Sequence, residues 1–426
     1  MAESGSSSSW GRRHTLLVLV FLAIVVGYSD RVNISVAAVA MKEDLGWNQT
    51  TKGVVLSSFF VGYLAFMFVG GWLANRFGGR SVLGIAVLWW SAFTLLTPLA
   101  AATSVPVLIA ARIGMGIGEA AMFPAAIELL GRWLPPEEQT RGIAIVNSGI
   151  PFGTVIGLLV TGWIVGGHHW SAAFYAFGLI GALWAVFWFA MTANDPHTDP
   201  RVPPAEGALL AASHTPGATR PRIPWAALLN RRATWALVVT HFACTWTLYM
   251  LLSWLPSFFR DVQHVSIAGS GMLSAAPWLS MLAMTYVAAG VSDALFRRTG
   301  RLALTRKTIQ GTGLLGSGAL LLLAQRAGSP ATALAIVCAA TGLLGFCWVG
   351  YAPNFLDLAP RHSAVLLGFS NTFATVPGIV GVAVAGWLVD ITGGYAATFA
   401  LAAAVSALGA LAFMVFGRAD RLLGET

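Results

Sequence analysis

Charged residues are scarce in this sequence of 426 residues. Lysine, arginine, aspartate and glutamate together make up 10% of the chain, whereas hydrophobic residues make up 57%. Soluble domains carry about 25% charged residues, so this chain has too few charges to cover a surface that faces water. The scarcity excludes an ordinary soluble protein and favours one that is embedded in a membrane.

Cysteine is scarce as well, and the motifs of several chemistries are missing. The three cysteines, Cys244, Cys338 and Cys347, lie in apolar stretches, and none has the spacing of a zinc site. No stretch matches GxxxxGK[ST], the phosphate-binding loop of many ATP-driven proteins. No cluster of nucleophile, base or metal ligands falls at membrane depth. We therefore predict that the protein is not an enzyme and that it uses no metal and no cofactor.

Long apolar runs dominate the sequence instead. Each run has about 20 residues, which is enough to cross a bilayer as a helix. The runs lack the alternation that is typical of β-barrel strands. We predict twelve transmembrane helices, near residues 14–37, 53–74, 81–101, 105–130, 142–166, 171–192, 233–259, 269–292, 306–325, 330–355, 363–389 and 394–417.

The net charge of +8 is spread unevenly along the chain. If the chain starts inside the cell, most basic residues fall in loops on the inner side and few fall in the outer loops. This bias is the positive-inside pattern, which predicts cytoplasmic termini and a location in the plasma (inner) membrane. It explains the basic charge without nucleic acid as a partner. We expect the partners to be the lipid bilayer and a small anion, and the protein to be a monomer.

An internal repeat indicates two related halves. Residues 134–165 align without gaps with residues 358–389, and the alignment pairs Asn147 with Asn371. The repeat unit is six spans, so both halves keep the same orientation and a site is expected between them. The sequence therefore predicts an all-α membrane protein with twelve transmembrane helices in two parallel-repeat six-helix bundles. The predicted parts are a cytoplasmic tail (1–13), an N-terminal bundle (14–192), a proline-rich cytoplasmic linker without helical period (193–232), a C-terminal bundle (233–417) and a second cytoplasmic tail (418–426).

Four charged residues fall deep inside the predicted spans: Asp30, Arg31, Arg112 and Glu119. A charge at the centre of a span costs about 2.5–3.5 kcal/mol on insertion scales, so it usually faces the bundle interior and has a function. One interpretation is that the four residues form ion pairs that hold helices in register. The other is that the arginines bind an anion while the carboxylates exchange protons. We adopt the second interpretation as a hypothesis.

Other polar and aromatic residues are candidates for the wall of a cavity between the bundles. Aromatic packing between helices explains several of them equally well, and the sequence leaves this choice open. Glu128 lies four residues before Arg132 at a predicted helix end, which favours a surface ion pair. The further candidates for substrate binding are Tyr63, His241, Tyr249, Asn354 and Asn371.

Several stretches resemble the major facilitator superfamily, and within it the anion:cation symporter family. The superfamily's loop motif between the second and third helices resembles GGWLANRFGGR, and the family's first and fourth helices resemble YSDRVNISVAAVAM and RIGMGIGEAAMFPA. Three further stretches resemble the sialin-like and plant organellar phosphate-transporter branches. They are WTLYMLLSWLPSFF, TRKTIQG and NFLDLAPRHSAVLLGFSNT. Bacterial sugar-acid transporters share the motifs of the first half.

The resemblance implies a secondary active transporter that works by alternating access. It implies proton-coupled symport of an organic anion, such as a sugar acid or another carboxylate. A sodium- or proton-coupled transporter of inorganic phosphate is the alternative, and a membrane-embedded sensor or enzyme is a remote one. By position, the resemblance assigns anion binding to Arg31 with support from Arg112, and proton coupling to Asp30 and Glu119.

The resemblance also identifies a conformational loop motif and two departures from the family pattern. Asn75 stands where the motif usually has an acid, which questions a latch role in the first half. Cys244 stands where vesicular glutamate carriers have an arginine, which disfavours glutamate as the substrate. The motif residues are Gly71, Asn75, Arg76, Gly79 and Arg80, with Asp293 and Arg298 in the second half.

Overall fold

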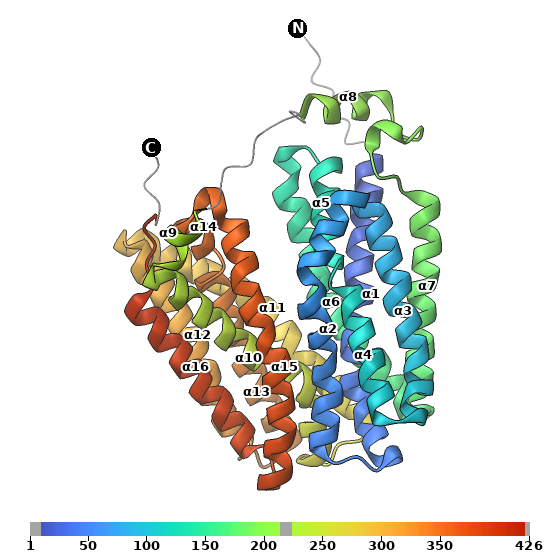
Figure 1. Cartoon of the computed structure of the whole chain (residues 1–426). Helices are drawn as coiled ribbons and strands as arrows, with labels where there is room; N and C mark the ends of the chain where they lie inside the picture. Colours follow the sequence, from blue (N-terminus) through green and yellow to red (C-terminus); the bar gives the residue numbers. More distant parts are fainter. Residues whose placement is uncertain (1–9, 214–223, 422–426) are drawn as a thin grey trace.

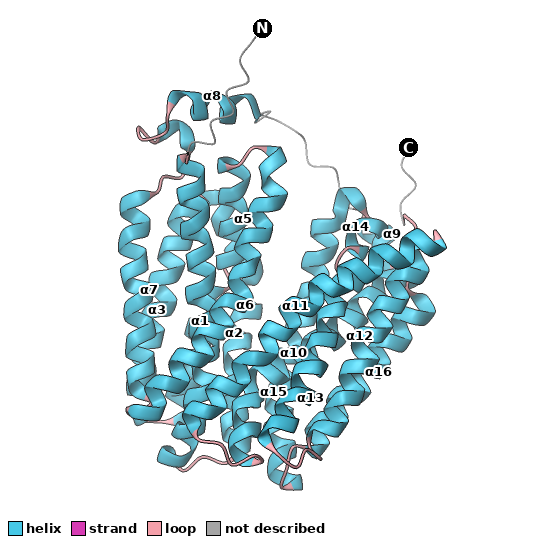
Figure 2. Cartoon of the chain, turned by 180° about the vertical axis from the view of Figure 1, so that it is seen from behind, coloured by secondary structure: helices cyan, strands magenta, loops and turns pink. Residues whose placement is uncertain are grey.

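The computed structural model describes residues 10–213 and 224–421. Every regular element in these residues is a helix (Figure 2). The helices form two bundles that lie side by side, one from each half of the chain (Figure 1). The hydrocarbon core of a bilayer offers no water to backbone groups, so a chain of apolar runs satisfies them within helices.

The N-terminal bundle is built from long helices, and two helices in series form its fourth crossing. These elements are α1 (Arg12–Leu45), α2 (Gln49–Phe77), α3 (Gly79–Thr103), α4 (Val105–Glu119), α5 (Met122–Trp133), α6 (Pro136–Gly167) and α7 (Ser171–Met191).

The C-terminal bundle repeats this plan, and a short helix again follows its fourth long one. These elements are α10 (Arg232–Asp261), α11 (Ile267–Thr299), α12 (Leu302–Ala324), α13 (Pro330–Gly350), α14 (Asn354–Leu358), the 3₁₀ turn η2 (Pro360–His362), α15 (Ser363–Thr392) and α16 (Ala396–Phe416).

The predicted fold class, an all-α protein of twelve transmembrane helices in two bundles, is confirmed. Within the described residues, eleven helical segments are long and apolar enough to cross a membrane. The twelfth position belongs to α12, whose first half carries Lys307 and Gln310 and is therefore less apolar. Several helices run beyond the predicted spans, because their polar ends continue the helix outside the apolar window. The first helix, for example, covers Arg12–Leu45 where the sequence predicts 14–37.

The fourth crossing is broken, whereas the sequence predicts one continuous helix. The chain turns directly after Glu119, where α4 ends. Pro124 has no N–H to donate to the carbonyl of Ala120, four residues earlier, so the helical hydrogen-bond ladder is interrupted there. Pro353 accompanies the break between α13 and α14 in the same way. As a result, Glu119 lies at a helix end inside the bundle.

The linker is partly helical, although the sequence predicts no helical period in it. It contains the 3₁₀ turn η1 (Pro196–Thr198), α8 (Pro204–Ser213) and the short helix α9 (Trp225–Leu229). A proline in the first turn and the alanine- and leucine-rich run that follows both favour a helix at α8. Residues 214–223 of the predicted linker lie outside the described residues.

Ionic contacts fix the first part of the linker to the N-terminal bundle. The carboxylate of Glu206 accepts hydrogen bonds from the backbone N–H groups of Arg12 (2.9 Å) and Arg13 (3.0 Å) at the start of α1. Burial by itself raises the pKa of Asp199, but the guanidinium of Arg201 donates to it at 2.8 and 3.1 Å and holds that pKa below its ordinary value. This part of the linker therefore belongs structurally to the first bundle.

The two bundles contact each other along α2 and α15 and along α6 and α11. They diverge toward the side on which both ends of the chain lie, here called the termini side (Figures 1 and 2). At the α6–α11 crossing, a Cβ atom on Gly271 would lie 2.9 Å from the Cα of Gly162. Glycine at both positions therefore allows the two backbones to approach closely.

Polar contacts join the bundles at the opposite end, here called the far side. The backbone N–H of Gln49 donates to Asp390 Oδ1 (3.0 Å), and its side-chain Nε2 donates to Asp261 Oδ2 (2.9 Å). Lys52 is buried there, and its Nζ donates to Ser257 Oγ (2.8 Å). The far side is thus closed by hydrogen bonds between the halves.

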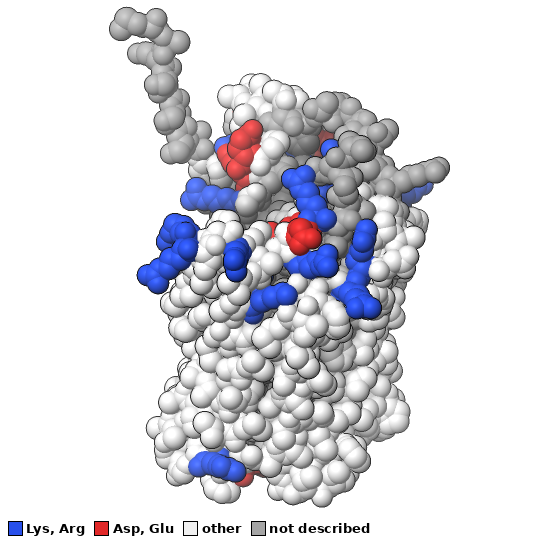
Figure 3. Space-filling model, turned by 90° about the vertical axis from the view of Figure 1, so that its left-hand side faces the viewer, with Lys and Arg blue, Asp and Glu red and all other residues white. Residues whose placement is uncertain are grey.

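Basic side chains mark the termini side of the molecule. Figure 3 shows lysine and arginine gathered at that end of the visible face, above a broad band with almost no charge. Such a band suits a surface that faces lipid. On this face (Figure 3), basic side chains are more numerous at the termini side than at the far side.

Candidate functional site

An ion pair between Arg31 and Glu119 lies in the interior of the N-terminal bundle. Arg31 Nη2 and Nε donate to Glu119 Oε2 at 2.8 and 3.0 Å. Arg31 is 6% exposed and Glu119 is fully buried. The second carboxylate oxygen, Oε1, has no hydrogen-bond partner within the described part of the chain. The pair therefore leaves one acceptor of a buried acid unused.

Aromatic rings surround the Arg31 guanidinium. Its central carbon lies 4.6 Å from the ring centre of Tyr28, 4.9 Å from that of Phe59 and 5.0 Å from that of Tyr63. Rings at this distance attract a cation through the negative charge of their faces. The rings hold the guanidinium in place without neutralising its charge, so it keeps its capacity to bind an anion.

Asp30 points to a different neighbour. Successive helical residues are rotated by about 100°, so Asp30 and Arg31 cannot face the same way. Asp30 Oδ2 accepts a hydrogen bond from Thr94 Oγ1 on α3 (2.9 Å), while Oδ1 has no partner in the described residues. Asp30 is 1% exposed. It is therefore a buried acid with one hydroxyl as its direct donor.

Arg112 on α4 is buried without a carboxylate at hydrogen-bond distance in the described residues. Its Nη1 contacts the sulfur of Met115 (2.9 Å), and its guanidinium lies 5.5 Å from the ring centre of Phe59. Its Nε has no partner in the part of the chain that the structure describes. Asp30 and Glu119 act on it electrostatically from α1 and from its own helix. Arg112 thus offers donor groups that the protein does not fully use.

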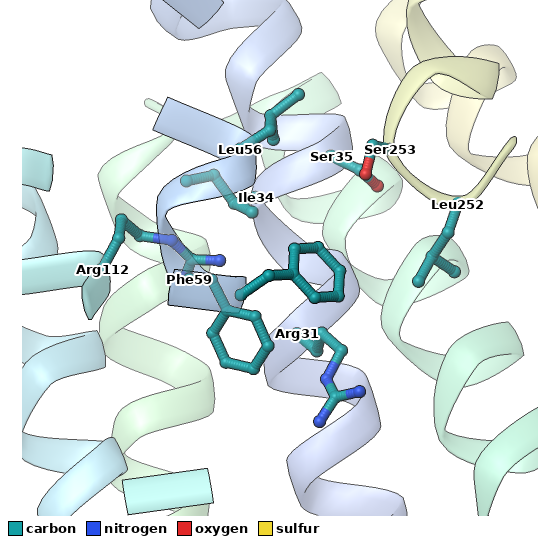
Figure 4. Close-up of a pocket in the computed structure, with 9 residues that line it drawn as sticks. Arg31, Ile34, Ser35, Leu56, Phe59, Arg112, Leu252 and Ser253 are labelled. Atoms are coloured by element: carbon teal, nitrogen blue, oxygen red, sulfur yellow. The ribbon is translucent and has the colours of Figure 1, made fainter. Parts of the chain in front are cut away.

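A small cavity joins the two arginines at the interface of the bundles. Figure 4 shows Arg31 entering from α1 and Arg112 from α4, with the ring of Phe59 between them. The C-terminal bundle contributes only two lining residues, both from α10. The residues that line the cavity are Arg31, Ile34, Ser35, Leu56, Phe59, Phe60, Arg112, Leu252 and Ser253. The cavity therefore has a cationic wall from one bundle and an uncharged wall from the other.

Two of the remaining candidates lie close to this site. Tyr63 contacts Arg31, as described above, and Tyr249 of α10 packs on the ring of Phe60 with centres 4.6 Å apart. Asn371 bridges the bundles elsewhere, where its Nδ2 lies 3.4 Å from the sulfur of Met67.

His241 and Asn354 are not brought to the cavity. His241 Nδ1 shares a hydrogen bond with Ser370 Oγ (2.9 Å), and its ring stacks on Tyr351 with centres 4.7 Å apart. Asn354 Nδ2 donates to the backbone oxygen of Arg418 (2.8 Å), so it ties the start of α14 to the segment that follows α16. Both residues have structural partners within the C-terminal half.

The loop motif forms a compact junction between α2, α3 and α5. Gly78 has φ of +83°, a conformation that favours glycine. The N–H of Gly79 donates to Glu128 Oε2 (2.7 Å), and Arg80 Nη2 donates to the carbonyl of Phe189 (2.7 Å). The predicted ion pair of Glu128 with Arg132 is present, but Glu128 also joins two helices.

The other motif residues lie on the surface of the junction. Asn75 Nδ2 donates to the carbonyl of Gly71 on its own helix (2.9 Å), so the position that departs from the motif bonds only locally in this contact. Arg76 is exposed at the end of α2. In the second half, Asp293 and Arg298 are also exposed. The structure therefore does not assemble a matching junction from these two residues.

Ser35, Ser253 and Thr94 are site residues that the sequence does not single out. Serine and threonine are common in apolar helices, and no periodic pattern distinguishes these three from the others. Their position beside the arginines or Asp30 follows from which helices are neighbours, and a single sequence does not specify that.

Comparison with known proteins places this arrangement in a family. The sequence model described as Major Facilitator Superfamily matches residues 19–305. The chain is similar to the ascorbate transporter, chloroplastic, of Arabidopsis thaliana (33% identical over 97% of this chain and 76% of that protein). It is also similar to the sodium-dependent phosphate transport protein 1, chloroplastic, of the same plant (33% identical, 97% and 80% covered). Human sialin is 31% identical, with 96% of this chain and 90% of sialin covered.

A solved structure agrees with the fold. It is that of a bacterial homolog to the human lysosomal transporter Spinster, with a TM-score of 0.78, 18% identity and coverage of 97% of this chain and 98% of that one. The match of the family model over more than half of the chain shows that the chain belongs to the major facilitator superfamily of membrane transporters. Within it, the chain is a member of the family of anion transporters that includes sialin and the chloroplast carriers, and it is a transporter rather than an enzyme.

Proposed function

We propose that the protein is a proton-coupled symporter of an organic anion that works by alternating access. One observation carries this proposal: the Arg31–Glu119 ion pair lies beside a cavity at the interface of the two bundles. An anion that enters this site meets a guanidinium that is already held by a carboxylate. Binding of the anion and the protonation state of Glu119 are therefore coupled by their shared partner.

The coupling follows from ordinary electrostatics. A carboxylate substrate that takes the planar fork of Arg31 removes the cation from Glu119. Glu119, left without its cation in a buried position, then binds a proton more readily. Release of the anion restores the ion pair and expels the proton. Arg112 supports binding from α4, and Asp30 is the second buried acid that takes part in proton coupling.

The arrangement of the bundles supports alternating access. They are held together on the far side and diverge on the termini side, so movement of one bundle against the other exposes the cavity to each side in turn. The gathering of basic residues on the termini side supports cytoplasmic termini. We propose that this state faces the cytoplasm and that a monomer in the plasma (inner) membrane is the working unit.

The relatives support two classes of substrate. The Arabidopsis ascorbate carrier is named for an organic anion, whereas a phosphate carrier from the same plant is named as sodium-dependent. Sodium- or proton-coupled phosphate transport is therefore the second candidate. An organic anion is preferred because the cavity also has apolar walls, formed by Ile34, Leu56 and Leu252.

Uptake into proteoliposomes tests both candidates. The purified protein is assayed with labelled gluconate, sialic acid, ascorbate, glutamate and inorganic phosphate, under a proton gradient, a sodium gradient or neither. The proposal predicts concentrative uptake of at least one organic anion that requires the proton gradient. Uptake of phosphate alone, driven by sodium, would favour the second candidate and contradict the first.

A further inference from the structure

Thr94 on α3 lies between two oxygen acceptors that compete for its one proton, and the sulfur of Met115 lies farther off, at 3.9 Å. Its Oγ1 lies 2.9 Å from Asp30 Oδ2 and 3.0 Å from the backbone oxygen of Trp90 on its own helix. A hydroxyl has a single donor and two acceptor lone pairs, so it donates to only one of these oxygens at a time. Its two lone pairs remain able to accept a hydrogen bond. The geometry thus permits two hydrogen-bond arrangements with the same heavy-atom positions.

Asp30 has few other groups that respond to its charge. Thr94 is the hydrogen-bond donor to Asp30 in the described residues, and the charged side chains that act on Asp30 are Glu119 and Arg112, both on α4. Arg31, the next residue of α1, turns its guanidinium toward Glu119 instead. A change in the proton occupancy of Asp30 is therefore met first by the Thr94 hydroxyl.

We propose that Thr94 is a positioning residue that stabilises Asp30 in both of its protonation states. This inference rests on the proposed function, in which Asp30 is one of two acids that take part in proton coupling. When Asp30 is ionised, Thr94 donates to its Oδ2. When Asp30 takes a proton from a hydronium ion, the new O–H donates to Thr94 Oγ1, and the Thr94 proton turns to the Trp90 carbonyl. One O–H bond forms on Asp30 as one breaks in the hydronium ion, which leaves as water, and Thr94 keeps its own proton.

The two arrangements matter because a buried polar group without a partner is costly. Each state of Asp30 keeps one hydrogen bond to α3, so neither state forces the helices apart. Without the hydroxyl, the ionised state loses its donor while the protonated state loses only an acceptor. The ionised state suffers more, because hydrogen bonds to charged groups are the stronger ones. Removing the hydroxyl should therefore make Asp30 hold its proton more firmly.

The variant Thr94→Val tests this inference, because valine keeps the branched shape and removes the hydroxyl. Thr94→Ser restores the hydroxyl, and Thr97→Val is the matched control. Thr97 is on the same helix and donates only to the backbone oxygen of Phe93 (2.8 Å) in the contacts described. The readouts are gradient-driven uptake against internal pH, and exchange of labelled for unlabelled anion. The probe is whichever of gluconate, sialic acid, ascorbate, glutamate or phosphate the wild type accumulates most.

For Thr94→Val we expect the internal pH of half-maximal uptake to rise by about one unit, and uptake at neutral internal pH to fall roughly tenfold. Exchange should survive, Thr94→Ser should return the profile toward wild type, and Thr97→Val should leave it unchanged. An unchanged profile in Thr94→Val, or the same shift in Thr97→Val, would overturn the inference. If Thr94→Val is poorly folded, Thr94→Ala replaces it in the comparison with Thr94→Ser.

The variant Asp30→Asn separates failure of this inference from failure of the proposed function. If Asp30→Asn loses gradient-driven uptake while Thr94→Val keeps the wild-type profile, only the role of Thr94 is wrong. If Asp30→Asn keeps wild-type uptake and pH profile, the assignment of Asp30 to proton coupling is wrong, and the inference about Thr94 falls with it.

Discussion

The two bundles have the same architecture but different electrostatics. α4 and α13 begin alike, with Ser104 and Ser329 as caps that accept a hydrogen bond from the third residue of the helix and with proline in the first turn. Arg112 and Val337 stand at the same distance from these two caps, and so do Glu119 and Leu344. Both partners in the second half are buried. The charges therefore belong to one copy of the repeat.

This difference shows that the buried charges are not a requirement of the fold. The second bundle builds the same crossing from valine and leucine, which pack without any desolvation of charge. Its buried polar groups include hydrogen-bonded pairs without a carboxylate, such as His241 with Ser370 and Gln310 with Thr240. The first bundle keeps its charges at a cost of membrane insertion. The asymmetry agrees with the proposed function, in which the first bundle binds the anion and couples the proton and the second bundle closes the site.

The largest expected effect comes from the cation at the centre of the charged half. Arg31→Lys keeps the charge but replaces the planar fork by a point charge, and Arg31→Ala also leaves Glu119 without its partner. We expect anion affinity to fall roughly a hundredfold in both variants, measured by uptake and by direct binding. Size-exclusion chromatography must first show that both variants are folded. Normal transport by both would remove Arg31 from the site.

Substitution of the two buried acids should affect net transport and exchange differently. Glu119→Gln and Asp30→Asn imitate the protonated acid permanently, so the proton can no longer be released. In the variant that removes the acid carrying the proton, we expect gradient-driven uptake to fall at least tenfold, roughly, while exchange of labelled for unlabelled anion survives. We place Glu119 first, because it is the acid that is paired with Arg31. Gradient-driven uptake that persists in both variants would make sodium the leading coupling ion.

A smaller effect is expected where the uncharged half meets the cavity. Ser253 is on the wall formed by α10, so its hydroxyl is placed to contact the uncharged part of a bound anion. We expect Ser253→Ala to weaken a hydroxylated organic anion about two- to tenfold, the value of one neutral hydrogen bond, with an unchanged pH profile. Competition assays between gluconate and phosphate measure this preference. An equal loss of affinity for gluconate and for phosphate would mean that Ser253 does not contact the organic part of the anion.

The smallest effect on coupling is expected at His241. Its partners Ser370 and Tyr351 lie in the C-terminal half, away from the cavity lining. His241→Gln should cost about 1–3 kcal/mol of stability through the lost buried hydrogen bond, measured by thermal unfolding in detergent. The pH profile of transport should stay that of the wild type. A shifted profile would give the second bundle a proton site and end the simple contrast between the halves.

The sequence predicts much of the fold because apolar length and repetition are local signals. The spans and the two bundles follow from runs of about 20 residues and from the alignment of the halves. The apolar run 105–130 predicts one continuous helix, although Pro124 and the small residues before it carry the signal for the break after Glu119. The sequence pattern does not predict helix α8, because the prolines around it dominate that stretch.

The site is predictable only in part, for a physical reason. Charge in an apolar span is visible in a sequence, so Asp30, Arg31, Arg112 and Glu119 stand out at once. Which acid pairs with which arginine depends on how α1 and α4 pack, and one sequence does not specify this. The same limit applies to Thr94, whose importance comes only from its distance to Asp30.

The central claim is that an anion displaces Glu119 from Arg31 and thereby loads a proton. The most direct measurement is proton uptake on anion binding by the purified protein in weakly buffered detergent solution with a pH indicator. The probe is the anion that the uptake panel identifies, and Glu119→Gln is the control. We expect about one proton taken up per bound anion in the wild type and much less in Glu119→Gln. Saturable binding to the wild type without any proton uptake would contradict the account.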